Sequence, residues 1–125
     1  MSESYEKFVA RVEQLADLGH AQALLSWDQE TYMPPRGTKM RARAQGTLAG
    51  LEHEMLIDSE LVDLVRDLQG EALEGDRAVN VRETARQQER ALKIPAPLVV
   101  EMTQTASLAH EAWVEAREKA DFSIF

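Results

Sequence analysis

A double proline divides the first half of the chain into two long amphipathic segments. The stretch Leu24–Gly37, L-L-S-W-D-Q-E-T-Y-M-P-P-R-G, reaches Pro34 and Pro35 shortly after two aromatic residues. Proline fixes φ, lacks an N–H and disfavours the helical region for the residue before it. The sequence therefore predicts that Met33 and Pro34 are extended and that a new helix begins after Gly37.

The two aromatic residues of this corner are Trp27 and Tyr32, and two carboxylates, Asp28 and Glu30, lie between them. Large aromatic side chains serve mostly in packing, so a hydrophobic helix corner is the favoured interpretation and ligand contact is the alternative. Paired acids can do acid–base chemistry only if their environments separate their pKa values. Their spacing alone indicates no catalytic site.

Apolar residues recur at three- and four-residue steps through most of the chain, which is the period of an amphipathic helix. No stretch shows a strand pattern of any length, and we predict an all-α fold, a helical bundle of about five helices. The predicted helices cover Ser4 to about Trp27, Thr38 to Met55, Glu60 to Leu68, Asp76 to about Leu92, and Pro97 or Leu98 to Ala120.

Three packing features are predicted within these helices. Gly19, and the pair Gly46 and Gly50, indicate close approach of neighbouring helices, because glycine is otherwise costly in a helix interior. The second helix is predicted to bury Met40, Ala44, Thr47, Leu48, Leu51 and Met55. An alanine-rich, heptad-like seam is predicted to make the last helix the spine of the domain, through Val99, Met102, Ala106, Ala109, Trp113, Ala116 and Ala120.

Charge and composition exclude several classes of protein. The net charge of −8 over 125 residues argues against binding duplex nucleic acid, which requires a phosphate-neutralising surface. No apolar stretch is long enough for a transmembrane helix, and the acidic N-terminus is unlike a secretory signal. The absence of cysteine excludes disulfides and fits a cytoplasmic location.

Two basic clusters interrupt this acidic background. Four cations fall between Arg36 and Arg43, and three arginines, Arg82, Arg86 and Arg90, are spaced four residues apart. We expect nearby carboxylates to pair with the first cluster, with an anion site as the alternative. The second is interpreted as a solvated helix face near acids, with recognition of a partner's or substrate's carboxylate as the alternative.

The three histidines do not form a metal site in the sequence. A helical zinc site of the H-E-x-x-H type needs two histidines four residues apart. His53-Glu54 and His110-Glu111 each lack the second histidine, so both are predicted to be surface or capping residues. His20 is predicted to be a hydrogen-bonded structural residue. We assign no catalytic or metal-binding residue in this chain.

Several blocks of the sequence resemble the N-terminal region of the Taq-type zinc metallocarboxypeptidases. The corner carries the W-D and M-P-P elements, at Trp27, Asp28, Met33, Pro34 and Pro35, whose role is unproven. Further matching blocks are H-A-Q-A-L-L-S-W-D, A-Q-G-T-L, S-L-A-H-E-A-W and the terminal A-D-F-S-I-F. Together these blocks extend the resemblance over essentially all 125 residues.

The resemblance implies a larger helical, cytoplasmic, homodimeric enzyme that removes amino acids from the C-termini of peptides. In that family a metal, zinc or cobalt, is held by H-E-x-x-H and a downstream glutamate, which no position here matches. Residues 1–125 are therefore expected to be an N-terminal, lid-like helical segment that is inactive alone. A stand-alone helical interaction module without enzymatic activity is the alternative.

The chain ends in an apolar cluster, which is unusual because termini are mostly polar and frayed. Phe122, Ile124 and Phe125 are three of the last four residues. Exposed apolar patches promote contacts between chains. We therefore expect self-association, with a dimer that buries this end and part of the seam around Trp113.

Overall fold

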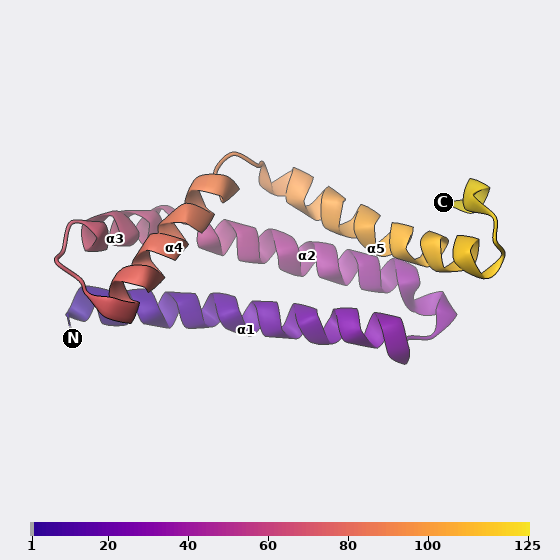
Figure 1. The fold of residues 1–125 in the computed structure, drawn as a ribbon, viewed down its shortest axis with the longest axis horizontal. Helices are drawn as coiled ribbons and strands as arrows, with labels where there is room; N and C mark the ends of the chain where they lie inside the picture. The colour runs from indigo at the N-terminus through magenta and orange to yellow at the C-terminus, as the bar shows by residue number, and fades with distance from the viewer. Residues whose placement is uncertain (1) are drawn as a thin grey trace.

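The computed structural model describes residues 2–125, leaving out Met1, and it confirms the all-α prediction. Three long helices lie alongside one another, and two shorter helices cover one end of the assembly (Figure 1). Two single 3₁₀ turns follow the first and the last helix. The elements are α1 (Glu3–Thr31), η1 (Pro35–Gly37), α2 (Thr38–Leu56), α3 (Ser59–Gln69), α4 (Gly75–Ala91), α5 (Ala96–Glu118) and η2 (Phe122–Ile124).

Helix α1 is longer at both ends than the sequence predicted. Ser2 caps the N-terminus, because its hydroxyl accepts a hydrogen bond from the Tyr5 N–H at 3.2 Å. At the other end the helix continues to Thr31, so Trp27, Asp28 and Glu30 are helical and do not lie in the corner. Only the prolines stop the helix.

The double proline produces the predicted corner. Met33 is outside any helix, and Pro34 is extended, with φ −61° and ψ 148°. Pro35 then opens the 3₁₀ turn η1, where its missing N–H is tolerated. Helix α2 begins at Thr38, as predicted.

The apolar core lies at the end of the molecule where α3 and α4 cover the start of α1 (Figure 1). Leu61, Val65 and Leu68 form the buried face of α3, and Asp58 caps that helix by accepting from the Leu61 N–H at 3.4 Å. Helix α4 begins at Gly75, with Glu74 in the N-cap position, so Asp76, where the predicted helix began, lies inside the first turn. The buried cluster consists of Tyr5, Phe8, Leu61, Val65, Leu68 and Val81.

Helices α2 and α5 share the most extensive helix–helix interface, and its register differs from the prediction. Met40 and Leu51 are exposed, while the line through Gly46 and Gly50 is buried. An added Cβ would lie 2.7 Å from Gln104 Cγ at Gly46 and 2.7 Å from Val100 Cγ2 at Gly50. The predicted close approach at these two glycines is therefore confirmed, but the predicted buried face of α2 is wrong.

The alanine seam of α5 is also shifted from its predicted position. Met102 and Trp113 are 57% and 39% exposed, so the contacts with α2 come from the line through Val100 and Gln104. Glycines on α2 admit these side chains. Of the predicted seam, Ala116 is buried, whereas Ala106 is exposed. The helix ends at Glu118 because Ala120 adopts a left-handed φ of 52°.

The remaining surface features agree with the sequence in part. Arg82 and Arg86 lie on a solvated face as predicted, but their acidic partner is Glu83 of the same helix. A Cβ added at Gly19 would meet only a Glu52 carboxylate oxygen, at 4.0 Å. The close helix contact predicted at Gly19 is therefore wrong. No described helix is both long enough and apolar enough to cross a membrane.

Candidate functional site

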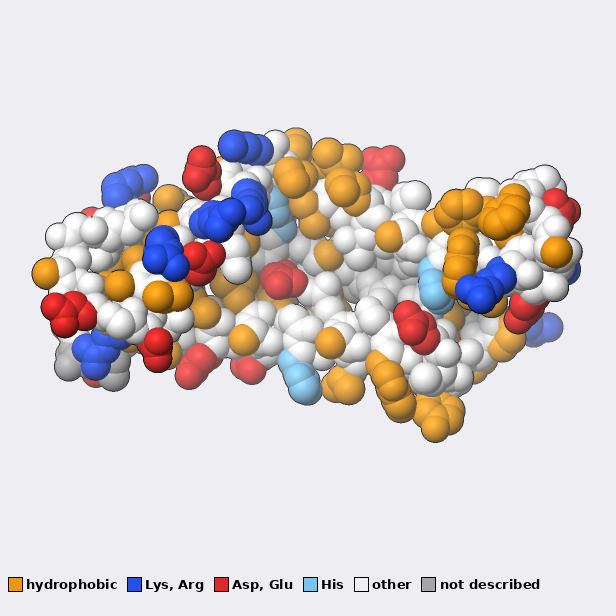
Figure 2. Space-filling view, in the orientation of Figure 1, with side chains coloured by type: hydrophobic (Ala, Val, Ile, Leu, Met, Phe, Trp, Pro, Cys, Tyr) orange, Lys and Arg blue, Asp and Glu red, His pale blue; other side chains and the backbone are white. Residues whose placement is uncertain are grey.

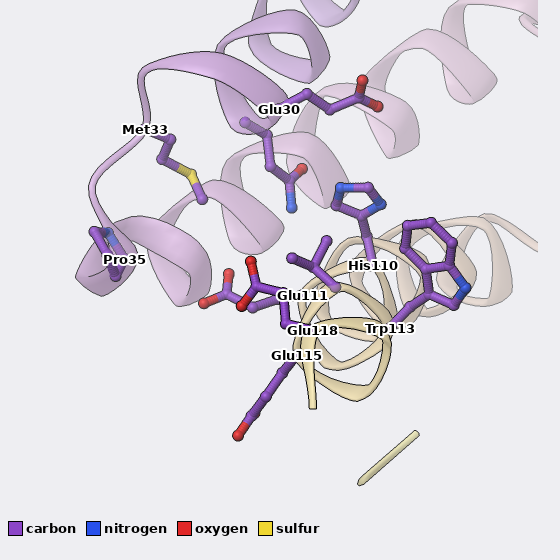
Figure 3. A pocket seen from close by; sticks show the side chains of 10 residues that line it. Glu30, Met33, Pro35, His110, Glu111, Trp113, Glu115 and Glu118 are labelled. Atoms are coloured by element: carbon purple, nitrogen blue, oxygen red, sulfur yellow. The ribbon is translucent and has the colours of Figure 1, made fainter. Parts of the chain in front are cut away.

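A groove of about 960 Å³ lies between the end of α1, the proline corner and the C-terminal half of α5. Met33 and Pro35 lie on the corner side, and His110, Glu111 and Trp113 lie on the α5 side (Figure 3). We call this the α1–α5 groove. The remaining lining residues are Gln29, Glu30, Val114, Glu115 and Glu118.

The corner that forms one wall is held in place by Asp28. Its backbone carbonyl accepts hydrogen bonds from the N–H groups of Tyr32 and Met33, at 3.0 and 2.9 Å. Its carboxylate accepts from Arg41 Nη2 at 2.6 Å, while Arg41 Nη1 donates to the Leu25 carbonyl at 2.6 Å. This arrangement fixes the end of α1 against α2 and confirms the expected pairing of one cation of the first basic cluster.

Of the five signature residues, Met33, Pro34 and Pro35 form the corner, whereas Trp27 and Asp28 lie in the last turns of α1. Met33 packs beside Gly37 and lines the groove together with Pro35. Trp27 is 57% exposed and packs against Tyr32, with ring centroids 5.5 Å apart. The pair therefore lies on the surface, which contradicts the predicted hydrophobic corner.

A polar layer joins α1 to the other long helices. Gln22 bonds to Glu52, and Gln45 Nε2 donates to Ser26 Oγ at 3.2 Å. Gln29 makes two hydrogen bonds to Ser107: its Nε2 donates to the Ser107 carbonyl at 3.1 Å, and its Oε1 accepts from Ser107 Oγ at 3.2 Å. The end of α1 is therefore held by hydrogen bonds, whereas its beginning is held by the apolar core.

Negative charge and one aromatic stack characterise the α5 wall. The His110 and Trp113 rings are stacked with centroids 6.1 Å apart, and the Arg117 guanidinium carbon lies 5.4 Å from the Trp113 ring centroid. Glu111 accepts a hydrogen bond from the Thr38 hydroxyl. Glu115 bonds to Lys119 and raises the pKa of that lysine.

The histidines do not form a metal centre here. Among residues 2–125, no three His, Asp or Glu side chains come together to hold a metal ion. His110 lines the groove, whereas His53 is buried elsewhere in α2, with no hydrogen-bond partner for its Nε2 in the described chain. His20 is exposed, contrary to the structural role predicted for it. The residues present do not fit the metal site that the sequence resemblance implies.

Sequence reasoning missed the residues that matter most in this groove. Neither Gln29 nor Ser107 belongs to a recognisable motif, and their pairing spans 78 positions of the chain. His110 was considered only as half of a zinc motif. Its place one turn before Trp113 on α5 was the available signal, because residues three apart lie on the same helix face.

The fold matches the N-terminal part of a family of helical metallopeptidases. The model of the carboxypeptidase Taq (M32) metallopeptidase family matches residues 7–125. The chain is 40% identical over 99% of its length to thermostable carboxypeptidase 1 of Pyrococcus furiosus, and 40% identical over 89% to that of Thermus thermophilus. It matches the crystal structure of BsuCP with a TM-score of 0.94 and 27% identity over 99% of the chain.

The chain therefore belongs to the carboxypeptidase Taq (M32) family. It spans about a quarter of the length of these relatives, 25% and 22% of the two thermostable enzymes and 25% of BsuCP. The family resemblance found in the sequence is confirmed.

Proposed function

We propose that residues 1–125 form the N-terminal helical segment of a metal-dependent carboxypeptidase, which releases C-terminal amino acids from peptides by hydrolysis. The observation that carries this proposal is the family match over residues 7–125. The segment acts as a lid that borders the substrate groove and restricts access to it. Met33 and Pro35 of the signature line one wall of that groove, and Asp28 holds this corner in place through its backbone carbonyl.

The metal of the parent enzyme is zinc or cobalt, bound outside this segment. The basis for this is that neither His-Glu pair continues to a second histidine. When bound by its own ligands, such a metal supplies an activated water for peptide hydrolysis. The residues described here contribute groove walls and polar contacts to the peptide.

The chain of 125 residues has no peptidase activity by itself in this proposal. The test is incubation with a peptide in the presence of added zinc or cobalt, followed by analysis of released amino acids. We expect no release above background. Metal-dependent release that is lost in His53→Ala or His110→Ala would contradict the proposal.

A stand-alone helical interaction module is the second candidate function. The exposed Phe122 and Phe125, 77% and 66% accessible, favour it because exposed aromatic side chains serve as docking surfaces. The natural coding sequence after Phe125 discriminates between the two. An in-frame H-E-x-x-H supports the carboxypeptidase, and a stop codon at that point supports the module.

The active form is a cytoplasmic homodimer in this proposal, and the segment alone self-associates through its C-terminal end. Hydrophobic side chains gather over the end of α5 (Figure 2), and Phe122 and Phe125 lie just beyond it. Sedimentation over a dilution series should give a dimer that weakens when the chain is shortened after Ala120. A monomer at high concentration would contradict self-association. A dimer of unchanged stability in the shortened chain would show that the residues after Ala120 do not form the interface.

The cytoplasmic location is tested by cell fractionation. Recovery of the protein with membranes would contradict it.

A further inference from the structure

The α1–α5 groove continues into a second cavity. This inner cavity, of about 310 Å³, lies between α1, α2 and α5. Gln29, Glu30 and His110 line both spaces. Figure 2 shows a hollow running between α1 and α5. Because the two spaces share three lining residues, we call them together the channel.

Gln29, which lines both spaces, is hydrogen-bonded to Ser107, which lines the inner cavity. The Gln29 amide N–H donates to the Ser107 carbonyl at 3.1 Å, and the Ser107 hydroxyl donates to the Gln29 amide oxygen at 3.2 Å. A peptide backbone also presents one donor and one acceptor per residue. An incoming backbone amide can therefore replace the Gln29 side chain at Ser107 without leaving either group of Ser107 unpaired.

An unpaired acceptor in the same channel also points to a ligand that donates hydrogen bonds. Gln45 lines the inner cavity and is only 7% exposed, yet its Oε1 has no hydrogen-bond partner within residues 2–125. Its Nε2 is already engaged with Ser26. Buried polar groups without partners are costly, and a backbone N–H in the inner cavity is a suitable donor.

The outer part of the channel selects for positive charge. Glu30, Glu111, Glu115 and Glu118 line the α1–α5 groove, and no lysine or arginine is among its described lining residues. Lys119 pairs with Glu115 and Arg117 lies over Trp113, so the four acids still outnumber the cations next to them. A groove lined by one sign of charge raises the local concentration of oppositely charged ligands. Glutamate or aspartate side chains are correspondingly disfavoured.

We propose that this channel binds an extended peptide segment with basic side chains, and that Gln29 is the gate the backbone displaces from Ser107. From Thr103 to Glu118 the α5 wall extends about 22 Å at 1.5 Å per residue, enough for about seven extended residues at roughly 3.3 Å each. The inference builds on the proposed function and gives its ligand class. Binding itself requires no metal.

The test measures peptide binding to the 125-residue chain by the fluorescence of Trp113, in a Trp27→Phe background because the chain has two tryptophans. The probe is a blocked octapeptide of alternating lysine and glycine. The controls are the same peptide with glutamate for lysine, and one with N-methylated backbone amides. We expect the lysine peptide to bind at least about tenfold more tightly than either control, with a preference over glutamate that shrinks at high salt.

Substitutions show whether Gln29 competes with the peptide for Ser107 or whether any glutamine removed from the surface of α1 has the same effect. Gln29→Ala should strengthen binding of the lysine peptide several-fold, because the competing side chain is gone. Gln14→Ala, at an exposed glutamine of the same helix, should leave it unchanged. Glu111→Gln with Glu118→Gln should weaken the binding several-fold.

Equal binding of the lysine and glutamate peptides would overturn the inference, and so would an unchanged affinity in Gln29→Ala. If Gln29→Ala does not fold, amide chemical shifts of the unsubstituted chain decide. Shifts at Gln29 and Ser107 on adding the lysine peptide support the gate, and shifts confined to other residues overturn it. These outcomes leave the proposed carboxypeptidase intact, since that depends on metal-dependent hydrolysis by the complete protein.

Discussion

Replacing Gly50 with alanine should destabilise the fold, although alanine is the better helix former. The added methyl carbon would lie 2.7 Å from Val100 Cγ2, whereas carbon atoms pack best at about 3.5–4.0 Å. Val100 is β-branched and stiff, so α2 and α5 must separate. Overpacking of this kind costs about 1–3 kcal/mol, and the helix-propensity gain of about 1 kcal/mol offsets only part of it.

Gly19→Ala provides a matched control for this substitution. Gly19 is also inside a helix, but an added Cβ would meet nothing closer than a Glu52 carboxylate oxygen at 4.0 Å. The same change should therefore stabilise the chain by about 1 kcal/mol. The difference between the two variants isolates the overpacking cost at Gly50, which we expect to be about 1–3 kcal/mol.

Urea unfolding followed by circular dichroism measures the change in the free energy of unfolding for each variant. The comparison holds if the slope of that free energy against urea concentration is unchanged. Adding Val100→Ala to Gly50→Ala should recover part of the loss, as a double-mutant cycle can show. Equal stabilisation by the two glycine substitutions would refute the close approach of α2 and α5. Gly46→Leu should also destabilise the fold, by about 1–3 kcal/mol. The Gln104 side chain lies against Gly46 and cannot move far enough to make room for leucine.

Three further changes test other parts of the fold. Leu68→Ala removes a fully buried side chain and should cost about 2–5 kcal/mol in the free energy of unfolding, measured in urea; a smaller loss would contradict the core assignment. Arg41→Ala should cost about 1–3 kcal/mol, because charge-assisted bonds to Asp28 and the α1 backbone are lost; an unchanged midpoint would argue against the anchored corner. The hydrogen bond from Arg11 lowers the pKa of Asp58, so its stabilisation is present above the unfolded pKa of about 3.9 and lost as pH falls through the lower folded value. The stability gap between the unsubstituted chain and Asp58→Asn should close over that acidic range, and a gap independent of pH would refute the pairing.

Helix positions could be predicted from the sequence because they depend on local rules. Apolar periodicity and the double proline placed the five helices to within a few residues at most ends. The end of α1 was placed early because the aromatic residues at 27 and 32 were assigned to the corner. Nothing in the backbone stops a helix there, and it continues until the residues next to the first proline.

Helix faces were harder to predict because they depend on which partner each helix meets. On α2 the glycines, and not Met40 or Leu51, face α5, since close backbone approach leaves no room for larger side chains. The same contact rotates α5 and leaves Met102 and Trp113 partly exposed. The Gln29–Ser107 hydrogen bonds could not be predicted for a related reason. The two polar residues are 78 positions apart and share no local sequence pattern.

The most direct test of the proposed function is a peptidase assay on the protein produced from the complete natural coding sequence. The assay uses the complete coding sequence because the chain spans only about a quarter of the length of its relatives. Mass spectrometry of a defined peptide should show stepwise loss of single residues from the C-terminus, abolished by a chelator and restored by zinc or cobalt. Intact peptide under all conditions, or shortening from the N-terminus, would contradict the proposal.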